Sequence, residues 1–259
     1  YFPPRSWSRE ADYRGLVGLV DRVATPFAWS VERLQAAGLD ATWVGHPVVD
    51  RITPPSAPER AELRRALGVD AGPTVVGLLP GSRPQEIGAI GPALLGAVRI
   101  IAAERPATRF VLSVAPSSDE RILRHQVERA ELANRVTLRS GVTEIVRAAD
   151  LVLTASGTAT LEAAAALCPM VVVYRGTGLM NLEMAARRAR FDYVALPNIV
   201  ADAGVVPELL AEDATPENMA AMALELLGNP AAAQAMRDRL VKVRAQLGPP
   251  GVSGRVAQM

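Results

Sequence analysis

Cysteine and histidine are scarce in this sequence. Cys168 is the only cysteine among 259 residues, and His46 and His125 are the only histidines. One cysteine excludes intramolecular disulfides and thiolate zinc clusters. Two histidines are also few ligands for a dedicated metal site. We therefore expect neither a metal ion nor another cofactor, and the lack of disulfides favours a reducing, cytoplasmic setting.

An excess of charge of either sign is also missing. The 28 Lys and Arg residues nearly balance 27 Asp and Glu residues, which gives a net charge of +1. This balance supplies no broad field for nucleic acid or anionic lipid, so a polybasic nucleic-acid-binding protein is disfavoured. Disorder is disfavoured as well, because 49% of the residues are hydrophobic and can offset the chain entropy lost on folding.

Long apolar runs are absent. A membrane-spanning helix needs ~20 apolar residues, and the longest candidate, residues 163–174, is interrupted by Pro169. Residues 1–10 carry prolines and charges where a signal peptide would have a basic region and an apolar core. Tyr1 is not an initiator methionine, so we expect the sequence to begin inside a longer protein that is soluble or peripheral.

From Thr74 onward, short β-rich runs alternate with stretches whose apolar residues recur every three or four positions. The short runs are evenly apolar, as in strands buried on both faces of a parallel sheet. This alternation predicts an α/β fold with a doubly wound parallel sheet. Strands are expected at residues 74–79, 109–114, 135–138, 151–154 and 170–174. Helices are expected at residues 85–104, 119–131, 142–149, 158–167, 179–190, 205–211, 216–227 and 231–246.

Prolines mark a boundary between two parts of the chain. Three of the five residues 54–58 are proline, which stiffens the chain and prevents a continuous helix or a central strand. We therefore predict that residues 1–52 are the end of a first α/β domain and that residues 53–58 are a linker. The doubly wound domain would occupy residues 59–230, followed by a helical segment at residues 231–259.

Two strand-to-helix junctions carry residues suited to binding an anion. In the first, Gly81 lets the backbone approach a ligand closely, Ser82 can cap the next helix or donate to an oxygen, and Arg83 offers a fork of donors that matches a phosphate. An ordinary turn with a capping serine and a solvated arginine explains the same residues, since short glycine motifs often match by chance.

The second junction, residues 154–162, places small and hydroxyl-bearing residues at a helix N-terminus. There the free backbone N–H groups of Ser156, Gly157, Thr158 and Ala159 can wrap a diphosphate, and Thr160 continues the same turn. Glu162 lies one turn further on, where its carboxylate can accept both hydroxyls of a ribose. The alternative is simple capping, with Thr158 as the cap and Glu162 favouring the helix N-terminus.

Other polar residues give weaker signals. His46 precedes the linker, which favours a contact between domains over a catalytic base. Asn198 follows Pro197 and can either reach a ligand from a loop or make a local turn. Cys168 has an apolar setting with no flanking base or cation, which indicates a buried structural thiol.

Six stretches in register resemble the lipid-A-disaccharide synthase family of bacterial glycosyltransferases. The similarity runs from the Trp7 region to about Gly251. It is carried by Val44-Gly-His-Pro47, Leu79-Pro-Gly-Ser-Arg83, Ala155-Ser-Gly-Thr-Ala-Thr-Leu-Glu162, Cys168-Pro-Met-Val-Val-Val-Tyr-Arg175, Asp192-Tyr-Val-Ala-Leu-Pro-Asn198 and Pro207-Glu-Leu-Leu-Ala-Glu-Asp213.

The resemblance implies a two-domain GT-B type fold, of which this chain is the Rossmann-like C-terminal half with the tail of the first domain. It implies transfer of a diacylated glucosamine from UDP to a diacylated glucosamine 1-phosphate, with peripheral membrane contact at the inner face of the cytoplasmic membrane. Residues 81–83, 156–160 and Glu162 match the family's nucleotide loops, and Asn198 matches its Leu-Pro-Asn motif. The general base is expected upstream of Tyr1, so we expect the chain alone to be inactive.

Two other functional classes remain open from the residues. Another UDP-N-acetylglucosamine enzyme, such as the peptidoglycan glycosyltransferase or the 2-epimerase, would use the same two loops. A nucleotide-binding module without transfer activity would use them as well.

Overall fold

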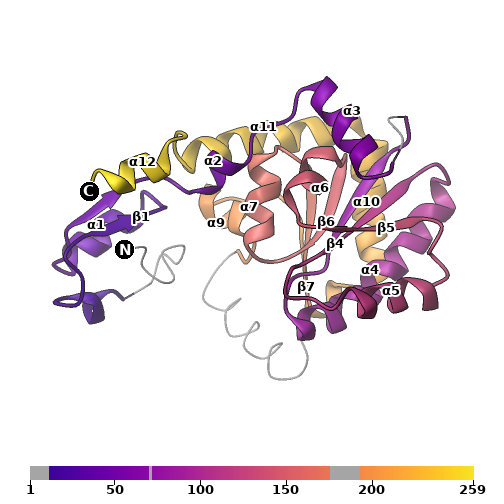
Figure 1. The fold of residues 1–259 in the computed structure, drawn as a ribbon, viewed down its shortest axis with the longest axis horizontal. Coiled ribbons are helices and arrows are strands. Elements are labelled where there is room, and N and C mark those ends of the chain that lie inside the picture. Colours follow the sequence, from indigo (N-terminus) through magenta and orange to yellow (C-terminus); the bar gives the residue numbers. More distant parts are fainter. Residues whose placement is uncertain (1–11, 70–71, 176–192) are drawn as a thin grey trace.

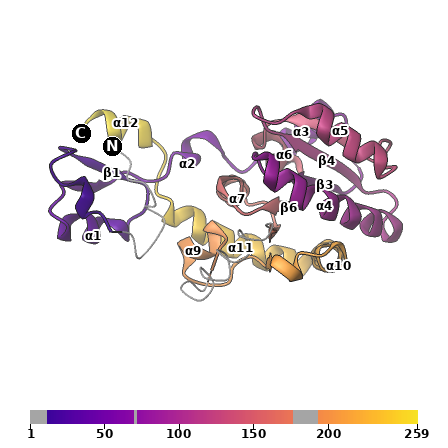
Figure 2. The same cartoon turned by 90° about the horizontal axis from the view of Figure 1, so that it is seen from below.

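The computed structural model describes residues 12–69, 72–175 and 193–259, which form two α/β units of unequal size (Figure 1). In the small unit, strands β1 (Val23–Thr25) and β2 (Ala41–Trp43) pair in parallel and are connected through helix α1 (Ser30–Ala36). A short 3-10 turn, η1 (Arg14–Leu16), precedes them. The two units lie side by side along the longest axis of the molecule (Figure 2).

The large unit is built on a parallel sheet with the strand order β5-β4-β3-β6-β7-β8. The strands run as β3 (Val75–Leu79), β4 (Arg109–Val114), β5 (Val136–Ser140), β6 (Leu151–Ala155), β7 (Met170–Tyr174) and β8 (Glu208–Leu210). The order reverses between β3 and β6, which is the topological switch point where such sheets bind ligands. The predicted doubly wound parallel sheet is confirmed.

Helices cover both faces of this sheet. One face packs on α4 (Pro84–Glu104), α5 (Glu120–Arg129) and α10 (Pro216–Gly228). The other face packs on α3 (Ala57–Ala66), α6 (Thr143–Ala148), α7 (Thr158–Ala165), α9 (Leu196–Ala201) and α11 (Pro230–Gln246). Along β3, β4, β6 and β7, side chains alternate between these two cores, as the two-residue period of a strand requires.

The predicted helix at residues 205–211 is wrong. Residues 208–210 instead form strand β8, which pairs with β7 in the register Val172↔Glu208, and a 3-10 turn, η2 (Ala211–Asp213), follows. Val205, Val206, Leu209 and Leu210 have helix-like spacing in the sequence, but the open edge of β7 takes up the segment as a strand. The helix expected at residues 179–190 lies outside the described residues.

Helix α4 has the length and composition of a membrane-spanning helix. The sequence interpretation overlooked it, because it took residues 163–174 as the longest apolar candidate. The helix contains 21 residues and passes this test by length and composition alone. Just over half of its most apolar window, 56%, is buried inside the structure, where α4 packs on the sheet and on α10. Core helices of globular domains are buried in the same way, so the composition of α4 is weak evidence for a membrane span.

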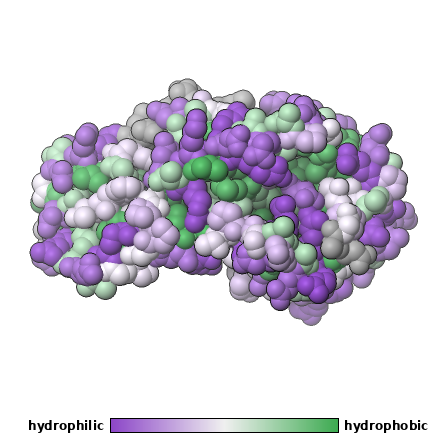
Figure 3. Space-filling view, turned by 90° about the horizontal axis from the view of Figure 1, so that it is seen from above, coloured by the Kyte–Doolittle hydropathy of each residue, from purple (hydrophilic) through white to green (hydrophobic). Residues whose placement is uncertain are grey.

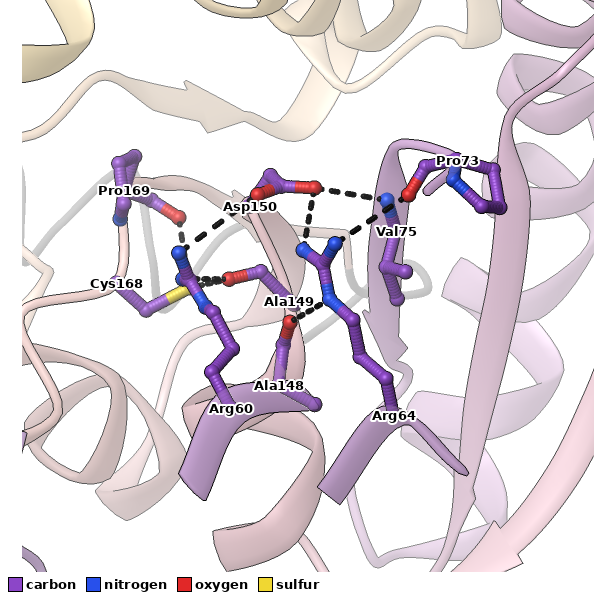
Figure 4. Close-up of polar contacts among 9 residues, drawn as sticks. All are labelled: Arg60, Arg64, Pro73, Val75, Ala148, Ala149, Asp150, Cys168 and Pro169. Carbon is purple, nitrogen blue, oxygen red and sulfur yellow. Dashed lines mark hydrogen bonds and ion pairs between the residues drawn. The ribbon is translucent and has the colours of Figure 1, made fainter. Parts of the chain in front are cut away.

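Helix α3 begins at Ala57 and therefore includes the last two residues of the predicted linker. Ser56 and Glu59 form a capping box at its start. At the amino end of the sheet, the Arg64 guanidinium donates to Asp150 Oδ2 (2.7 Å) and to the Ala148 carbonyl (3.0 Å), and Arg60 lies beside the same carboxylate (Figure 4). These arginines hold α3 against the sheet.

Cys168 lies beside Arg60 and is fully buried (Figure 4). Burial raises the pKa of the Cys168 thiol to about 12, so the thiolate that would react is disfavoured. The structure thus supports the interpretation of Cys168 as a structural thiol.

Within the described ranges, the chain crosses between the units twice, at adjacent places. The first crossing runs through α2 (Val48–Arg51), and the second runs from α11 to α12 (Val252–Ala257), which lies against the small unit (Figure 1). The His46 N–H donates to the Leu247 carbonyl (2.7 Å), and Asp50 accepts from the Gly251 N–H (2.6 Å). Residues 231–259 are therefore divided between the two units.

His46 lies at this double crossing, as its position before the linker suggested. Its ring centroid is 5.6 Å from that of Phe27, and burial lowers the pKa of its imidazole to about 4. Seen from above, apolar and hydrophilic residues are intermingled over this face, with one apolar patch near the middle of the molecule (Figure 3).

Gly77 in the centre of β3 allows α6 to approach the sheet. A Cβ built on Gly77 would lie 2.7 Å from Ile145 Cγ2 and 2.8 Å from Val152 Cγ1.

We expect Gly77→Ala to lower the free energy of unfolding by about 1–3 kcal/mol through overpacking, measured by urea denaturation. The matched control is Gly88→Ala in α4, where a Cβ meets open space and stability should hold or rise by up to about 1 kcal/mol. Equal stability of the two variants would contradict the packing argument.

Candidate functional site

The two predicted junctions meet at the carboxyl end of the sheet. Strands β3 and β6 are hydrogen-bonded neighbours, and Leu79 is the partner of Thr154 at their ends. The turn at Pro80–Arg83 and the turn at Ser156–Gly157 therefore leave the same edge side by side. This adjacency is the geometry that a shared anion site requires.

Both turns open into one cavity of about 580 Å³. Of the residues proposed from the sequence, it is lined by Gly81, Ser82, Arg83, Ser156, Gly157, Thr158, Ala159 and Glu162. Its other walls come from Leu79, Glu86, Ser113, Ala115, Val142, Ala155, Tyr174, Val194, Leu196 and Ile199. Thr160 and Asn198 are not among the lining residues.

Gly81 is required by the backbone of the first turn. Its φ is +100°, and a Cβ at this position would lie 2.5 Å from Glu86 Oε2. Larger residues rarely adopt this φ, so a substitution would strain the turn, and the Glu86 side chain would also have to move. The Ser82 carbonyl accepts a hydrogen bond from the Ser117 hydroxyl (3.2 Å), which ties the loop after β4 to this turn.

Arg83 is the N-cap residue of α4, and its guanidinium reaches the cavity from there. The side chain is 76% exposed and donates to Glu86 Oε1 at 2.7 Å, whereas the Glu86 side chain is 17% exposed. Glu86 was missed by the sequence interpretation, although its i+3 spacing from Arg83 was a usable signal. The pair holds the guanidinium at the mouth of the cavity, where the exposed side of Arg83 can meet an anion.

The N-terminus of α7 faces the cavity. Gly157 is its N-cap residue, and no side chain in the described part of the chain caps the helix. The Thr160 hydroxyl instead donates to the Gly157 carbonyl (2.6 Å), and the Ser156 hydroxyl donates to the Val194 carbonyl (3.3 Å). Capping by Thr158, the alternative considered above, is thus not found. The Thr160 N–H donates to the Gly157 carbonyl (3.1 Å), whereas the N–H groups of Thr158 and Ala159 precede the first acceptor that a helix offers, and both residues line the cavity.

Glu162 lies one turn into α7 and lines the same cavity. Thr143, the first residue of α6, donates its hydroxyl hydrogen bond to Glu162 Oε2 at 3.2 Å. This contact orients the carboxylate, whose oxygens can still accept a hydroxyl hydrogen bond from a ligand.

Asn198 has a different position from the one expected. It belongs to α9 rather than to a loop, is 1% exposed, and accepts from the N–H groups of Val205 (2.8 Å) and Val206 (2.9 Å). Its amide N–H₂ donates to the Val206 carbonyl (2.9 Å) and to Glu208 Oε1 (2.8 Å). With both ends of the amide engaged inside the protein, Asn198 supports the cavity wall instead of lining it.

Glu208, at the start of β8, was also missed. Besides Asn198, its carboxylate accepts from the N–H groups of Val194 (3.1 Å) and Ala195 (2.7 Å). Val194 lines the cavity, and its carbonyl accepts from Ser156. The Glu208 carboxylate therefore fixes the wall that follows the undescribed residues 176–192. The stretch from Pro207 to Asp213 was one of those that carry the family resemblance, but Glu208 was given no role there because β8 itself was not predicted.

The sequence matches one protein family over most of its length. The model of the family described as lipid-A-disaccharide synthetase matches residues 7–252. Lipid-A-disaccharide synthase of Anaeromyxobacter dehalogenans is 40% identical over 260 residues, covering 100% of this chain and 67% of the relative. The chain thus spans about two thirds of the length of this curated relative.

Solved structures show the same fold at low sequence identity. The UDP complex of S. aureus MnaA superposes with a TM-score of 0.67 at 16% identity, covering 98% of this chain and 65% of that one. WaaG, a glycosyltransferase involved in lipopolysaccharide biosynthesis, gives a TM-score of 0.58 at 16% identity over 91% of this chain and 61% of that one. These likenesses show a GT-B type fold.

The Glu208 carboxylate generates a prediction about stability. Glu208→Ala leaves the N–H groups of Val194 and Ala195 and the Asn198 amide without this acceptor, and we expect a loss of about 2–4 kcal/mol in the free energy of unfolding, measured by urea denaturation. Glu212→Ala, at an exposed acidic residue in η2, should change stability by less than about 0.5 kcal/mol. An equally small effect at Glu208 would contradict its assigned role.

Proposed function

The chain belongs to the lipid-A-disaccharide synthase family, and we propose that its cavity holds the UDP part of a sugar-nucleotide donor for glycosyl transfer. The reaction that the family implies moves a diacylated glucosamine from UDP onto a diacylated glucosamine 1-phosphate. The observation that carries the site assignment is the meeting of the β3 and β6 turns around one cavity. The peptidoglycan glycosyltransferase and the 2-epimerase, which would use the same two loops, are not favoured, because the lipid-A-disaccharide synthetase family model matches residues 7–252.

The diphosphate would lie between the two turns. Gly81 and Ser82 form one side, the N-terminus of α7 forms the other, and Arg83 stands at the mouth. Backbone N–H groups and the positive end of the helix dipole stabilise an anion there. The same donors would stabilise the negative charge that grows on UDP as the acceptor hydroxyl displaces it from the anomeric carbon.

The rest of the donor would extend from the diphosphate in two directions. Toward β4 and β5, Glu162 would accept the ribose hydroxyls, with Thr143 holding its carboxylate. Toward β7 and β8, the cavity wall is formed by Tyr174, Val194, Leu196 and Ile199. These largely apolar residues suit the acylated sugar, because acyl chains avoid a polar wall.

The lipid-linked acceptor and peripheral contact with the inner face of the cytoplasmic membrane belong to the same proposal. Both substrates carry acyl chains, which partition into a bilayer. An acceptor presented at the membrane surface would enter the cavity from its open side.

Binding of UDP tests the site. We expect UDP to bind more tightly than UMP. Arg83→Ala should lower the affinity for UDP by about tenfold or more and the affinity for UMP by less, because the guanidinium contacts the second phosphate. Glu162→Gln should weaken both nucleotides by a similar factor. Calorimetric titration measures both effects. Arg65→Ala, at an exposed arginine of α3, is the control and should leave the affinity for UDP unchanged. If neither Arg83→Ala nor Glu162→Gln changes the affinity for UDP, the site assignment is wrong.

Product analysis tests the reaction. The protein, expressed with any residues that its gene encodes before Tyr1, is incubated in detergent with the acylated UDP-glucosamine and the acylated glucosamine 1-phosphate. We expect a disaccharide and free UDP in equal amounts, detected by mass spectrometry, and loss of both products with Arg83→Ala. Release of free N-acetylmannosamine from UDP-N-acetylglucosamine would instead identify an epimerase, and binding without turnover would identify a nucleotide-binding module.

A further inference from the structure

A largely buried serine lines the cavity with a hydroxyl that has no partner among the described residues. Ser113 lies in β4, is 4% exposed and lines the cavity. Its hydroxyl makes no hydrogen bond to any residue in the described ranges. By contrast, the buried hydroxyls of Thr25 and Ser30 bond each other, and Thr154 and Thr160 donate to backbone carbonyls. Ser113 is largely buried and lines the cavity, so its unpaired hydroxyl, which can both donate and accept, is available to a ligand there.

The alternation of β4 sets the direction of this side chain. Phe110, Leu112 and Val114 pack in the core that includes α4 and α5, whereas Val111 packs in the core that includes α6 and α7. Ser113 is two residues beyond Val111 and points to that same face. It thus lies on the side of the sheet that carries Glu162.

The order of the strands places Ser113 relative to a bound nucleotide. Along the carboxyl edge the order is β5, β4, β3, β6. The two anion-binding turns follow β3 and β6, Ser113 lies near the end of β4, and Val142 lines the cavity just after β5. A nucleotide with its diphosphate between β3 and β6 and its ribose at Glu162 therefore extends its base toward Ser113 and Val142.

We propose that the Ser113 hydroxyl forms a hydrogen bond with the nucleobase of the donor. This inference rests on the proposed function, since it takes the cavity to be the UDP site. A serine hydroxyl both donates and accepts, so it can bond a ring carbonyl or a ring N–H of uracil. Val142 provides an apolar contact for the ring at the same end of the cavity. Ser113 thus determines affinity for the nucleoside part of the donor, while Arg83 acts on the phosphates.

The test compares Ser113→Ala with the unaltered chain in titrations of UDP, UMP and ribose 5-phosphate. We expect UDP and UMP to bind about tenfold more weakly to the variant, by the same factor, because one hydrogen bond to the base is lost. Ribose 5-phosphate should bind unchanged. The melting temperature should not fall, because the hydroxyl makes no bond within the described protein. A hydroxyl needed for folding would lower the melting temperature instead.

Thr108→Val is the matched control. Thr108 is also buried with a hydroxyl that has no partner among the described residues, but it precedes β4 at the opposite end of the strand. Its removal should therefore leave UDP affinity unchanged. Tight UDP binding that is unaltered by Ser113→Ala overturns the Ser113 assignment, and so does an equal loss for ribose 5-phosphate. Failure of the unaltered chain to bind UDP overturns the proposed function itself, so the two failures are distinguishable.

Discussion

Parallel hydrogen bonding between β3 and β6 is the constraint on which the site depends. Leu79 and Thr154, which are partners at the ends of these strands, lie far apart in the sequence, and only the sheet brings them together. Because parallel neighbours end at the same edge, the glycine turn at Gly81 and the start of α7 open onto one cavity. A strand order that separated β3 from β6 would leave each turn an ordinary strand-to-helix connection.

Polar side chains from outside the two turns keep this geometry in place. On the β8 side, the Glu208 carboxylate fixes the backbone at Val194 and Ala195, and on the β5 side Thr143 orients Glu162. The first contact satisfies the backbone N–H groups of Val194 and Ala195. The second fixes the orientation of the Glu162 carboxylate. The site is thus preorganised by residues that need not touch a ligand themselves.

The sequence was informative wherever one pattern dominated a segment. Evenly apolar runs predicted β3, β4, β6 and β7 closely, and the 3.6-residue period predicted α4. Strand β8 was missed because three residues are too few to show a period, and the pairing that defines it comes from β7. Asn198 was misplaced because Pro197 suggested a loop, although proline is also common in the first turn of a helix. The positions of Glu208 and Ser113 beside the cavity depend on distances between groups that a single sequence does not record, whereas the pairing of Glu86 with Arg83 could have been found from their i+3 spacing.

The return of α12 to the small unit has a mechanical consequence. Two described segments pass between the units at nearly one point, where the His46 N–H meets the Leu247 carbonyl and a Cβ on Gly248 would lie 3.0 Å from Gly45 Cα. Ala24, Phe27 and Val44 of the small unit belong to the same buried apolar cluster as residues of the large unit, so the crossing is packed as well as hydrogen-bonded. A force that acts on either unit is therefore transmitted to the other through this one place.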